Sequence, residues 1–450
     1  MLKGLAAGAV GVVAAACQPK TVIVEKEKIV KETVIVEGQP KEVTKIVEVA
    51  AAGPTEVSVY VGFVGAHGQV GRRTKEYNGS QDKVKMIEVP VGEDWETKLR
   101  AQIEKGPPEV EGITSHHFFR MLALWANLGI VQPIEEFLNA SSIIPVDEYW
   151  GDMFDLENFK WDTSWKGKVY GVPMAIDTTA QGYMKSHFEA AGLSPAREDR
   201  AQTWDEVLDH AIALREWGKD DGVWGMYGWR VYHQTAGAIF QSISTDLYTD
   251  DDFINVDSED FRKTMRIMNA WIENDVAPNP PWLEAAHNVG RAGKMSQWQS
   301  TMGTTRRVKE VWGSIAVAEP MPTLAEPTGT GGQHFYLTGG YLFAKAQHPQ
   351  EVVDWLLWLY GPQNDVNADI MVNDIKWFPV FKSQWKKQIE DKPENHYMLE
   401  FDRYFSKGKL IPKTLHYEIE WKTIQKYCER YFSGELSVEE ASQKCDEEMR

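Results

Sequence analysis

The sequence is short of positive charge, and it lacks the common motifs of hydrolytic enzymes. Its 450 residues carry 48 Lys and Arg against 66 Asp and Glu, which gives a formal net charge of −18. A nucleic-acid-binding surface needs excess Lys and Arg, so this balance argues against nucleic acid, and against adhesion to anionic lipid by charge alone. Neither Gly-x-Ser-x-Gly nor His-Glu-x-x-His occurs, and both are signatures of hydrolase sites.

The N-terminal region has no hydrophobic run long enough to cross a bilayer. Leu2–Ala16 is apolar except for Lys3, and it is shorter than the ~20 residues that a membrane-spanning helix needs. One positive charge before a short apolar run is typical of a signal peptide. Three alanines before Cys17 resemble a bacterial lipobox, so we expect a signal peptide over residues 1–16 and lipidation of Cys17. The alternative is a small apolar cysteine in a cleaved or buried segment.

Aromatic residues are absent from residues 18–56. The motif Thr21–Glu25 recurs as Thr33–Glu37 and, more loosely, as Thr44–Glu48. Alternating Val with Glu or Lys gives no face that could bury a core. We expect residues 17–54 to form a lipid-anchored flexible tether with local extended character, and a short coiled coil is the alternative.

The rest of the composition is that of a large soluble protein. Apolar residues make up 43% and charged residues 25%, which are ordinary values. Beyond ~250–300 residues single cores tend to divide, so we expect two lobes. The 18 tryptophans are many, and flat indole faces suit carbohydrate rings, although most tryptophans belong to cores.

The patterning predicts alternating strands and helices. Glu56–Gly62 alternates as a first strand, and the helical spacing of apolar residues within Asp94–Lys105 predicts an amphipathic helix. Thr203 and Glu206 have the spacing of a capping box, which predicts a further helix.

A helical hairpin is predicted at the C-terminus. Cys428 lies on the apolar face of the helix that starts near Trp421, Ser437 begins the next helix, and Cys445 faces back. In an exported protein these two cysteines form a disulfide or are two small core residues, and the sequence leaves both open.

One stretch, Trp161–Leu193, carries a family resemblance. Gly167–Pro173, Asp177, Tyr183 and the Phe188–Leu193 segment stand in the order of the hinge segment of bacterial extracellular solute-binding proteins of family 1, which serve ABC importers. Matches of this order run from about Val57 to the C-terminus. The chain therefore resembles this maltose-binding-protein-like family over nearly all of its length.

The resemblance implies an α/β fold of the two-lobe, periplasmic-binding-protein-like type II class. Each lobe would be a sheet flanked by helices, with three crossover segments near residues 171–175, 338–340 and 378–379. The first lobe would comprise residues 55–172 and 339–377. The second would comprise residues 173–338 and 378–450.

The implied function is that of a monomeric, extracytoplasmic lipoprotein without a cofactor. It would capture a carbohydrate, an oligosaccharide by preference, and deliver it to the transmembrane subunits of an ABC permease, touching the membrane only through its lipid. Two alternatives stay open. One keeps the receptor and changes the cargo to a peptide, polyamine or polyol phosphate. The other is an extracellular glycan-active enzyme, which would need two carboxylates ~5–10 Å apart across a cleft.

Sugar recognition needs aromatic faces and polar side chains on loops at the cleft. The tryptophans alternatively pack the hinge, Asp177 alternatively caps a turn, and adjacent His116 and His117 point to opposite faces, which disfavours a metal site. The candidates are His67, Ser115, His116, His117, Asp177, Trp229, Trp298, Tyr341 and Trp377.

Overall fold

The computed structural model describes most of the chain, and its contacts divide it into two compact units. The first comprises Met1–Glu56 with Gln81–Lys85, and the second comprises Val57–Ser80 with Met86–Arg450. The residues described are 27–36, 39–48, 53–61, 73–92, 94–154, 159–160, 162–194, 202–228, 231–244, 246–249, 253–278, 292–301, 318–321, 334–375, 377–399, 409–410 and 414–450.

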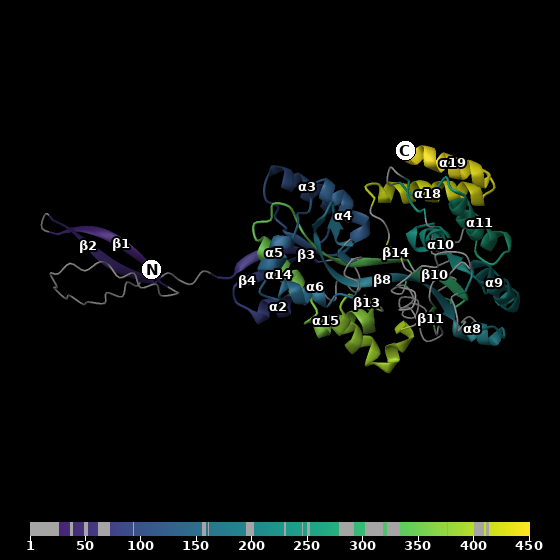
Figure 1. The fold of residues 1–450 in the computed structure, drawn as a ribbon, viewed down its shortest axis with the longest axis horizontal. Coiled ribbons are helices and arrows are strands. Elements are labelled where there is room, and N and C mark those ends of the chain that lie inside the picture. Colours follow the sequence, from purple (N-terminus) through teal and green to yellow (C-terminus); the bar gives the residue numbers. More distant parts are fainter. Residues whose placement is uncertain are drawn as a thin grey trace. The chain divides into compact units, whose positions relative to one another are not determined.

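The first unit contains a β-hairpin. Strand β1 (Glu27–Val36) pairs with β2 (Gln39–Glu48) in antiparallel register, from Glu27 opposite Glu48 to Val36 opposite Gln39 (Figure 1). The extended character expected of this segment takes the form of paired strands. An isolated two-stranded hairpin is only marginally stable in water, so the flexibility of the tether stays a prediction.

The remaining strands form a mixed sheet and one short ribbon. The sheet order is β4-β3-β5-β12-β8-β10-β9, with β11 and β13 paired to β8 and β14 paired to β12, while β6 pairs with β7. Their bounds are β3 (Thr55–Val61), β4 (Val84–Pro90), β5 (Gly112–His117), β6 (Ser164–Trp165), β7 (Lys168–Val169), β8 (Gly171–Met184), β9 (Tyr227–Gly228), β10 (Gln297–Thr301), β11 (Ala318–Met321), β12 (His334–Leu342), β13 (Phe378–Pro379) and β14 (Lys409–Leu410).

Helices cover the sheet, and several lie where the sequence predicted them. The predicted Asp94–Lys105 helix is α3, and Thr203 and Glu206 form both bonds of a capping box at the start of α9. The helices are α2 (Thr74–Ser80), α3 (Trp95–Lys105), α4 (Phe118–Asn127), α5 (Glu135–Ala140), α6 (Val146–Gly151), α8 (Lys185–Ala190), α9 (Trp204–Gly218), α10 (Ala238–Ile243), α11 (Glu259–Glu273), α14 (Pro349–Tyr360), α15 (Asp365–Asp369), α16 (Lys382–Trp385), α18 (Tyr417–Phe432) and α19 (Val438–Met449).

Wider and tighter helical turns complete the second unit. In the described ranges, the π-helical turns are η1 (His233–Gly237), η3 (Ile370–Asp374) and η4 (Lys386–Glu390), and η5 (Pro393–Met398) is a 3-10 helix. None of the helices in the described ranges combines the length and hydropathy that a membrane-spanning helix needs.

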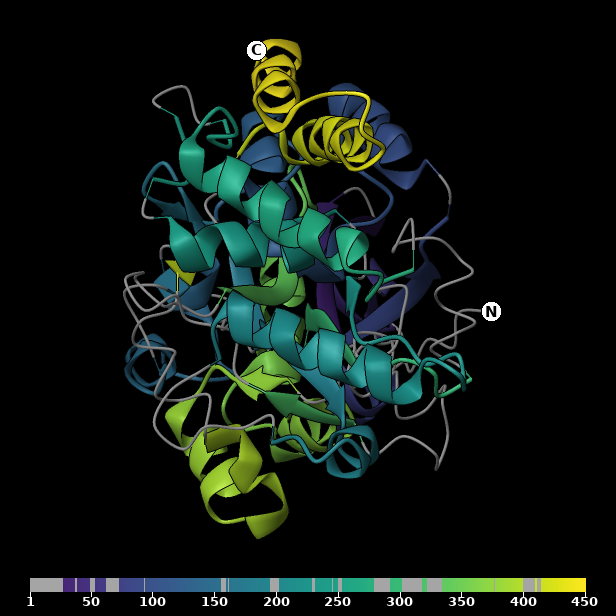
Figure 2. The ribbon, with the colours of Figure 1, turned by 90° about the vertical axis from the view of Figure 1, so that its right-hand side faces the viewer.

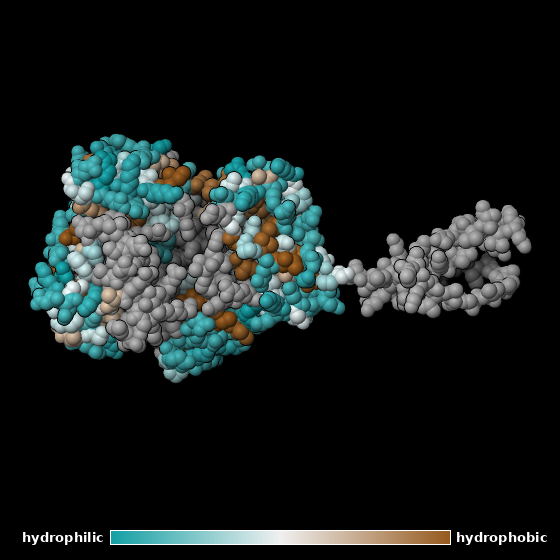
Figure 3. All heavy atoms as spheres, turned by 180° about the vertical axis from the view of Figure 1, so that it is seen from behind, coloured by the Kyte–Doolittle hydropathy of each residue, from teal (hydrophilic) through white to brown (hydrophobic). Residues whose placement is uncertain are grey.

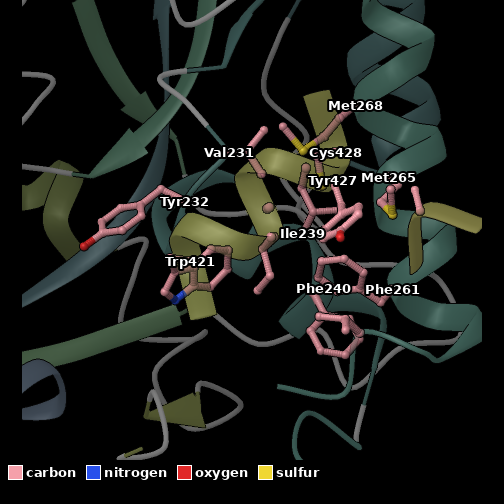
Figure 4. Packing of buried hydrophobic residues seen from close by; sticks show 14 of the residues in the cluster. Val231, Tyr232, Ile239, Phe240, Phe261, Met265, Met268, Trp421, Tyr427 and Cys428 are labelled. Carbon is pink, nitrogen blue, oxygen red and sulfur yellow. The ribbon is translucent and has the colours of Figure 1, made fainter. Parts of the chain in front are cut away.

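One large core joins α9, α10 and α11 to the C-terminal hairpin. Phe240 packs edge-on against Phe261 with ring centroids 5.1 Å apart, and Trp421 approaches Tyr232 at 5.7 Å (Figure 4). In Figure 2 the yellow helices α18 and α19 lie beside the teal helices of this core. The predicted hairpin of two helices is therefore confirmed, and Ser437, which was predicted to begin the second helix, forms a capping box there with Glu440.

The two C-terminal cysteines belong to this core. Cys428 and Cys445 are 1% and 2% exposed, and the structure contains them as free thiols rather than a disulfide. Of the two alternatives left open by the sequence, the structure has the pair of small core residues. Burial raises the pKa of both thiols, so neither is a reactive thiolate at neutral pH.

The segment after β13 packs on a helix from the first part of the chain. The Phe154 N–H donates to the Val380 carbonyl at 2.9 Å, and the Lys382 N–H donates to the Asp152 carbonyl at 2.7 Å. The sequence placed these two segments in different lobes. The residue boundaries of the lobes stay a prediction, and these contacts favour assigning Val380–Trp385 to the first lobe.

Candidate functional site

The candidate site lies where two long strands carry the sheet from one group of helices to the other. Strand β8 runs between the group with α3, α4 and α14 and the group with α9, α11 and α18 (Figure 1). It pairs with β12 from Gly171 to Thr178, and its remaining residues pair with β10 and β11. We call residues 175–178 of β8 and 335–338 of β12 the waist.

Register breaks mark one end of the waist. Opposite β12, strand β8 has one extra residue, Met174, because Thr338 pairs with Ala175 and Gly339 with Pro173. On the other side of β12, strand β5 has one extra residue, Ser115, because Gly339 pairs with His116 and Gly340 with Thr114. Extra residues of this kind are β-bulges, which bend a strand and increase its twist. Two bulges therefore flank the same point of β12.

The bulge explains how proline is accommodated in a central strand. Pro173 would be expected to break a regular strand, and yet β8 continues through it to Met184. Proline lacks the N–H of a ladder bond and is tolerated at bulges.

Gly340 is constrained by packing, since an added Cβ would lie 2.3 Å from Leu356 Cδ2 and 2.9 Å from the Ile113 carbonyl oxygen.

The three predicted crossover segments meet here. Strand β12 pairs with one side of β8 at Ala175 and Ile176, and β13 also pairs with these two residues, through Pro379 and Phe378. A strand has only two sides, so β8 lies between the other two segments. The predicted crossings near residues 171–175, 338–340 and 378–379 are therefore side by side.

Two predicted ligand residues come together at the waist. Asp177 pairs with Tyr336 of β12. On the other side of β8, Phe378 pairs with Ile176, so Asp177 and Trp377 each adjoin a member of this pair. Asp177 is 3% exposed, and its Oδ1 accepts the N–H of Thr178 at 2.9 Å. A carboxylate and an indole therefore belong to neighbouring segments at the same crossing.

A π-helical turn positions Trp377. Its N–H donates to the carbonyl of Met371, within η3, at 3.0 Å, and its side chain is 7% exposed. Such π-turns are rare and occur often at functional sites. The sequence contained no signal for this turn, because hydrophobic periodicity does not distinguish it from an α-helix.

Ser115 and His117 are placed near the waist by their backbones alone. Ser115 is the bulge residue of β5, and His117 pairs with Thr338, which in turn pairs with Ala175. The side chains of these residues and of His116 lie outside the described part of the structure, as do His67 and Trp229 entirely. Their ligand roles stay predictions.

Two other candidates occupy core positions. Tyr341 is fully buried, and its ring meets that of Trp125 edge-on at 5.3 Å between centroids. Trp298 is 1% exposed, and its ring lies against Gly182, where an added Cβ would be 2.1 Å from Cε2. Both side chains pack beside the sheet, and their ligand roles stay predictions.

A residue that the sequence analysis did not select lies beside the waist. Asp162 is fully buried, and its Oδ2 accepts the N–H of Leu337 at 3.1 Å. Burial, followed by the charge of Asp162, raises the pKa of Tyr341. The local sequence gave no signal, because Asp162 resembles an ordinary turn residue before β6.

No metal centre accompanies the waist in the described ranges: they contain no group of three His, Cys, Asp or Glu side chains placed to hold a metal ion.

The described surface seen in Figure 3 is mostly hydrophilic, with smaller hydrophobic groups. A carboxylate and an indole at one crossing can bind hydroxyl groups and an apolar ring face, which are the two surfaces of a sugar.

A comparison with protein families decides the assignment. The family model described as bacterial extracellular solute-binding protein matches residues 70–366. The chain belongs to this family. The resemblance inferred from the hinge segment is confirmed. The predicted two-lobe, type II fold with its three crossovers is also confirmed, because the chain shares it with the solute-binding proteins described next.

Relatives and solved structures of this solute-binding protein are distant in sequence. A putative binding protein of Brucella abortus is 23% identical over 281 residues, which cover 59% of this chain and 62% of the relative. An ABC substrate-binding protein of Listeria monocytogenes in complex with cycloalternan has a TM-score of 0.71 at 14% identity, covering 88% of this chain and 98% of that one. The sugar-binding protein MalE of Xanthomonas citri has a TM-score of 0.70 at 20% identity, covering 88% and 96%.

Proposed function

We propose that this solute-binding protein is the substrate-binding lipoprotein of an ABC importer and that its cargo is a carbohydrate, an oligosaccharide by preference. The proposal rests on the positions of Asp177 and Trp377, each next to a member of the Ile176–Phe378 pair, where three chain segments cross. Carboxylates bond sugar hydroxyls strongly, and indole faces cover the C–H surfaces of sugar rings.

The fold supports capture between two lobes. Asp177 and Trp377 are 3% and 7% exposed, so a cargo reaches them only when the lobes separate at the waist. Closure then requires that the cargo bind the closed arrangement more tightly than the open one. Similar folds in complex with cycloalternan, α-D-tagatose or maltose support a sugar over a peptide, polyamine or polyol phosphate.

The remaining parts of the proposal concern location and partners. Export by the signal peptide of residues 1–16, a lipid on Cys17 and the tether of residues 17–54 would hold a monomeric receptor at the outer face of the membrane. A permease made of separate proteins would receive the sugar. We propose that the protein does not transform its cargo, and incubation with a labelled oligosaccharide should leave the sugar intact.

A thermal-shift screen tests the cargo. The chain from Gln18 onward is mixed with cycloalternan, D-tagatose, maltose or maltotriose. A sugar present at a hundred times its dissociation constant stabilises the fold by about 2.7 kcal/mol, which should raise the melting temperature by about 2 °C or more. If no sugar shifts the melting temperature and a peptide or polyamine does, the carbohydrate proposal is wrong.

Substitutions at the waist test the site. For the sugar that binds, Trp377→Ala should weaken affinity about thirtyfold, as expected for a buried aromatic contact, and Asp177→Asn should weaken it about tenfold. Trp217→Ala is the matched control, because Trp217 is 42% exposed and packs on His187, away from the waist. Equal affinities of all three variants would move the site elsewhere.

A further inference from the structure

Strand β12 changes its neighbour on one side as it passes through the waist. On its other side it stays paired with β8, from Tyr341 opposite Gly171 to Phe335 opposite Thr178. On the changing side, β5 pairs with residues 338–342, and β14 pairs with residues 334–335. Among the strands described, none is paired with residues 336–337 on that side. The ladder is therefore interrupted for two residues.

Asp162 occupies the interruption. Its Oδ2 accepts the backbone N–H of Leu337 at 3.1 Å, and the residue is fully buried. A carboxylate replaces a strand carbonyl as the acceptor at this one position. Hydrogen bonds to an ionised acceptor are stronger than bonds between neutral groups, and a buried carboxylate cannot exchange a lost partner for bulk water.

Hydrogen bonds hold the segment that carries Asp162 to neighbouring residues that precede β8. The hydroxyl of Thr163 donates to the Phe159 carbonyl at 2.9 Å, and the Thr163 carbonyl accepts the N–H of Tyr170 at 2.9 Å. These bonds fix Asp162 to the residues that immediately precede β8. Leu337, by contrast, belongs to a strand that passes through the waist.

We propose that Asp162 is a positioning residue of the hinge. By accepting the Leu337 N–H, it sets the equilibrium between the open and closed arrangements of the lobes. This equilibrium in turn determines the affinity for the cargo, which Asp162 itself does not touch. This inference rests on the proposed function. Rotation of the lobes moves the amide relative to a carboxylate that stays fixed, so the bond differs between the arrangements. Cargo affinity follows the fraction of molecules in the binding-competent arrangement.

A matched control separates this role from simple stabilisation. Glu420, on α18, is also fully buried, and its Oε1 accepts the backbone N–H of Ile254 at 3.0 Å. It forms the same kind of bond, but Ile254 belongs to the large hydrophobic core and Glu420 lies on α18, so neither partner is at the waist. Asp162→Ala and Glu420→Ala should therefore lower the melting temperature by similar amounts.

The decisive measurements use the chain from Gln18 onward. In sugar-free protein, Asp162→Ala should increase hydrogen–deuterium exchange of both crossing strands, residues 334–342 and 171–178, and change the radius of gyration in small-angle scattering. Glu420→Ala should do neither. For the sugar that wild type binds in the thermal-shift screen, Asp162→Ala should change the dissociation constant about tenfold. Asp162→Asn, which keeps an acceptor oxygen, should restore most of the wild-type value.

The outcomes distinguish the two proposals. If wild type binds no sugar, the proposed function fails, and the exchange and scattering data still decide the role of Asp162. If Asp162→Ala does not fold, Asp162→Ser is used instead, because the serine side chain is too short to reach Leu337. Exchange and scattering equal to those of Glu420→Ala would overturn the hinge role. Failure of the Ala, Ser and Asn variants to fold would also overturn it, since Asp162 would then act on stability alone.

Discussion

The contact between Gly182 and Trp298 provides a direct test of the sheet register. These residues are paired across β8 and β10, and the indole lies over the glycine. A Cβ built on Gly182 would meet three ring atoms of Trp298 at 2.1–2.3 Å. The ring is 1% exposed, and a close-packed interior leaves it little room to move. Gly182→Ala should therefore strain the centre of the sheet.

We expect Gly182→Ala to lower the free energy of unfolding by about 3 kcal/mol. This is the upper part of the usual range for overpacking, roughly 1–3 kcal/mol, because a rigid ring rather than a flexible chain end opposes the new methyl group. Replacing glycine otherwise gains about 0.5–1 kcal/mol, so the strain itself is larger than the measured loss. Urea unfolding followed by circular dichroism gives the difference between variant and wild type.

Two controls sharpen this test. Gly79, in helix α2, has no atom within 4 Å of an added Cβ, so Gly79→Ala should be neutral or stabilise by about 0.5–1 kcal/mol. In a Trp298→Leu background, Gly182→Ala should cost less than about 1 kcal/mol, because the opposing ring is gone. If Gly182→Ala unfolds at the same urea concentration as wild type, the ring does not lie on Gly182 and the β8–β10 register is wrong.

Two further predictions concern ionisable side chains in the second unit. Because burial raises the pKa of Cys428 and Cys445, iodoacetamide at pH 8 should leave both thiols unmodified until urea unfolds the protein, and rapid labelling of the native protein would contradict their burial. Burial also raises the pKa of Tyr227 to about 12, above its unfolded value of about 10. Its contribution to stability is complete below pH 10 and is lost as pH rises from about 10 to 12, so Tyr227→Phe should lose less stability than wild type over that range.

Features that depend on neighbours in sequence were predictable from the sequence. The apolar residues Trp95, Leu99 and Ile103 are buried on one face of α3, as their spacing indicated. The capping box of Thr203 and Glu206 also formed, because its bonds join residues three apart in the chain. Such patterns fix where elements begin, end and turn their apolar faces, whatever surrounds them.

The side chains of the candidate site were harder to predict, because a strand has two faces and the sequence does not say which one meets the cargo. Tyr341 and Trp298 were predicted to lie on loops at the cleft. In the structure, their rings instead fill the space beside the strands, against Trp125 and Gly182. Asp177 and Trp377 reach the same crossing through the pairing of Ile176 with Phe378, in segments about 200 residues apart, which no local pattern encodes.

The waist shows how signals of strand breakage acquire a different meaning in the fold. Pro173 and the Gly339–Gly340 pair both oppose regular strands, and yet β8 and β12 run through them without interruption. The irregularity appears in the pairing, where Met174 and Ser115 are extra residues opposite these glycines. Bulges bend strands and leave ladder groups unpaired, so a side-chain acceptor such as Asp162 can enter the sheet a residue or two away. A hinge built this way needs residues that weaken strand pairing at the same position along each strand that joins the lobes. Pro173 on β8 and Gly339–Gly340 on β12 meet that condition.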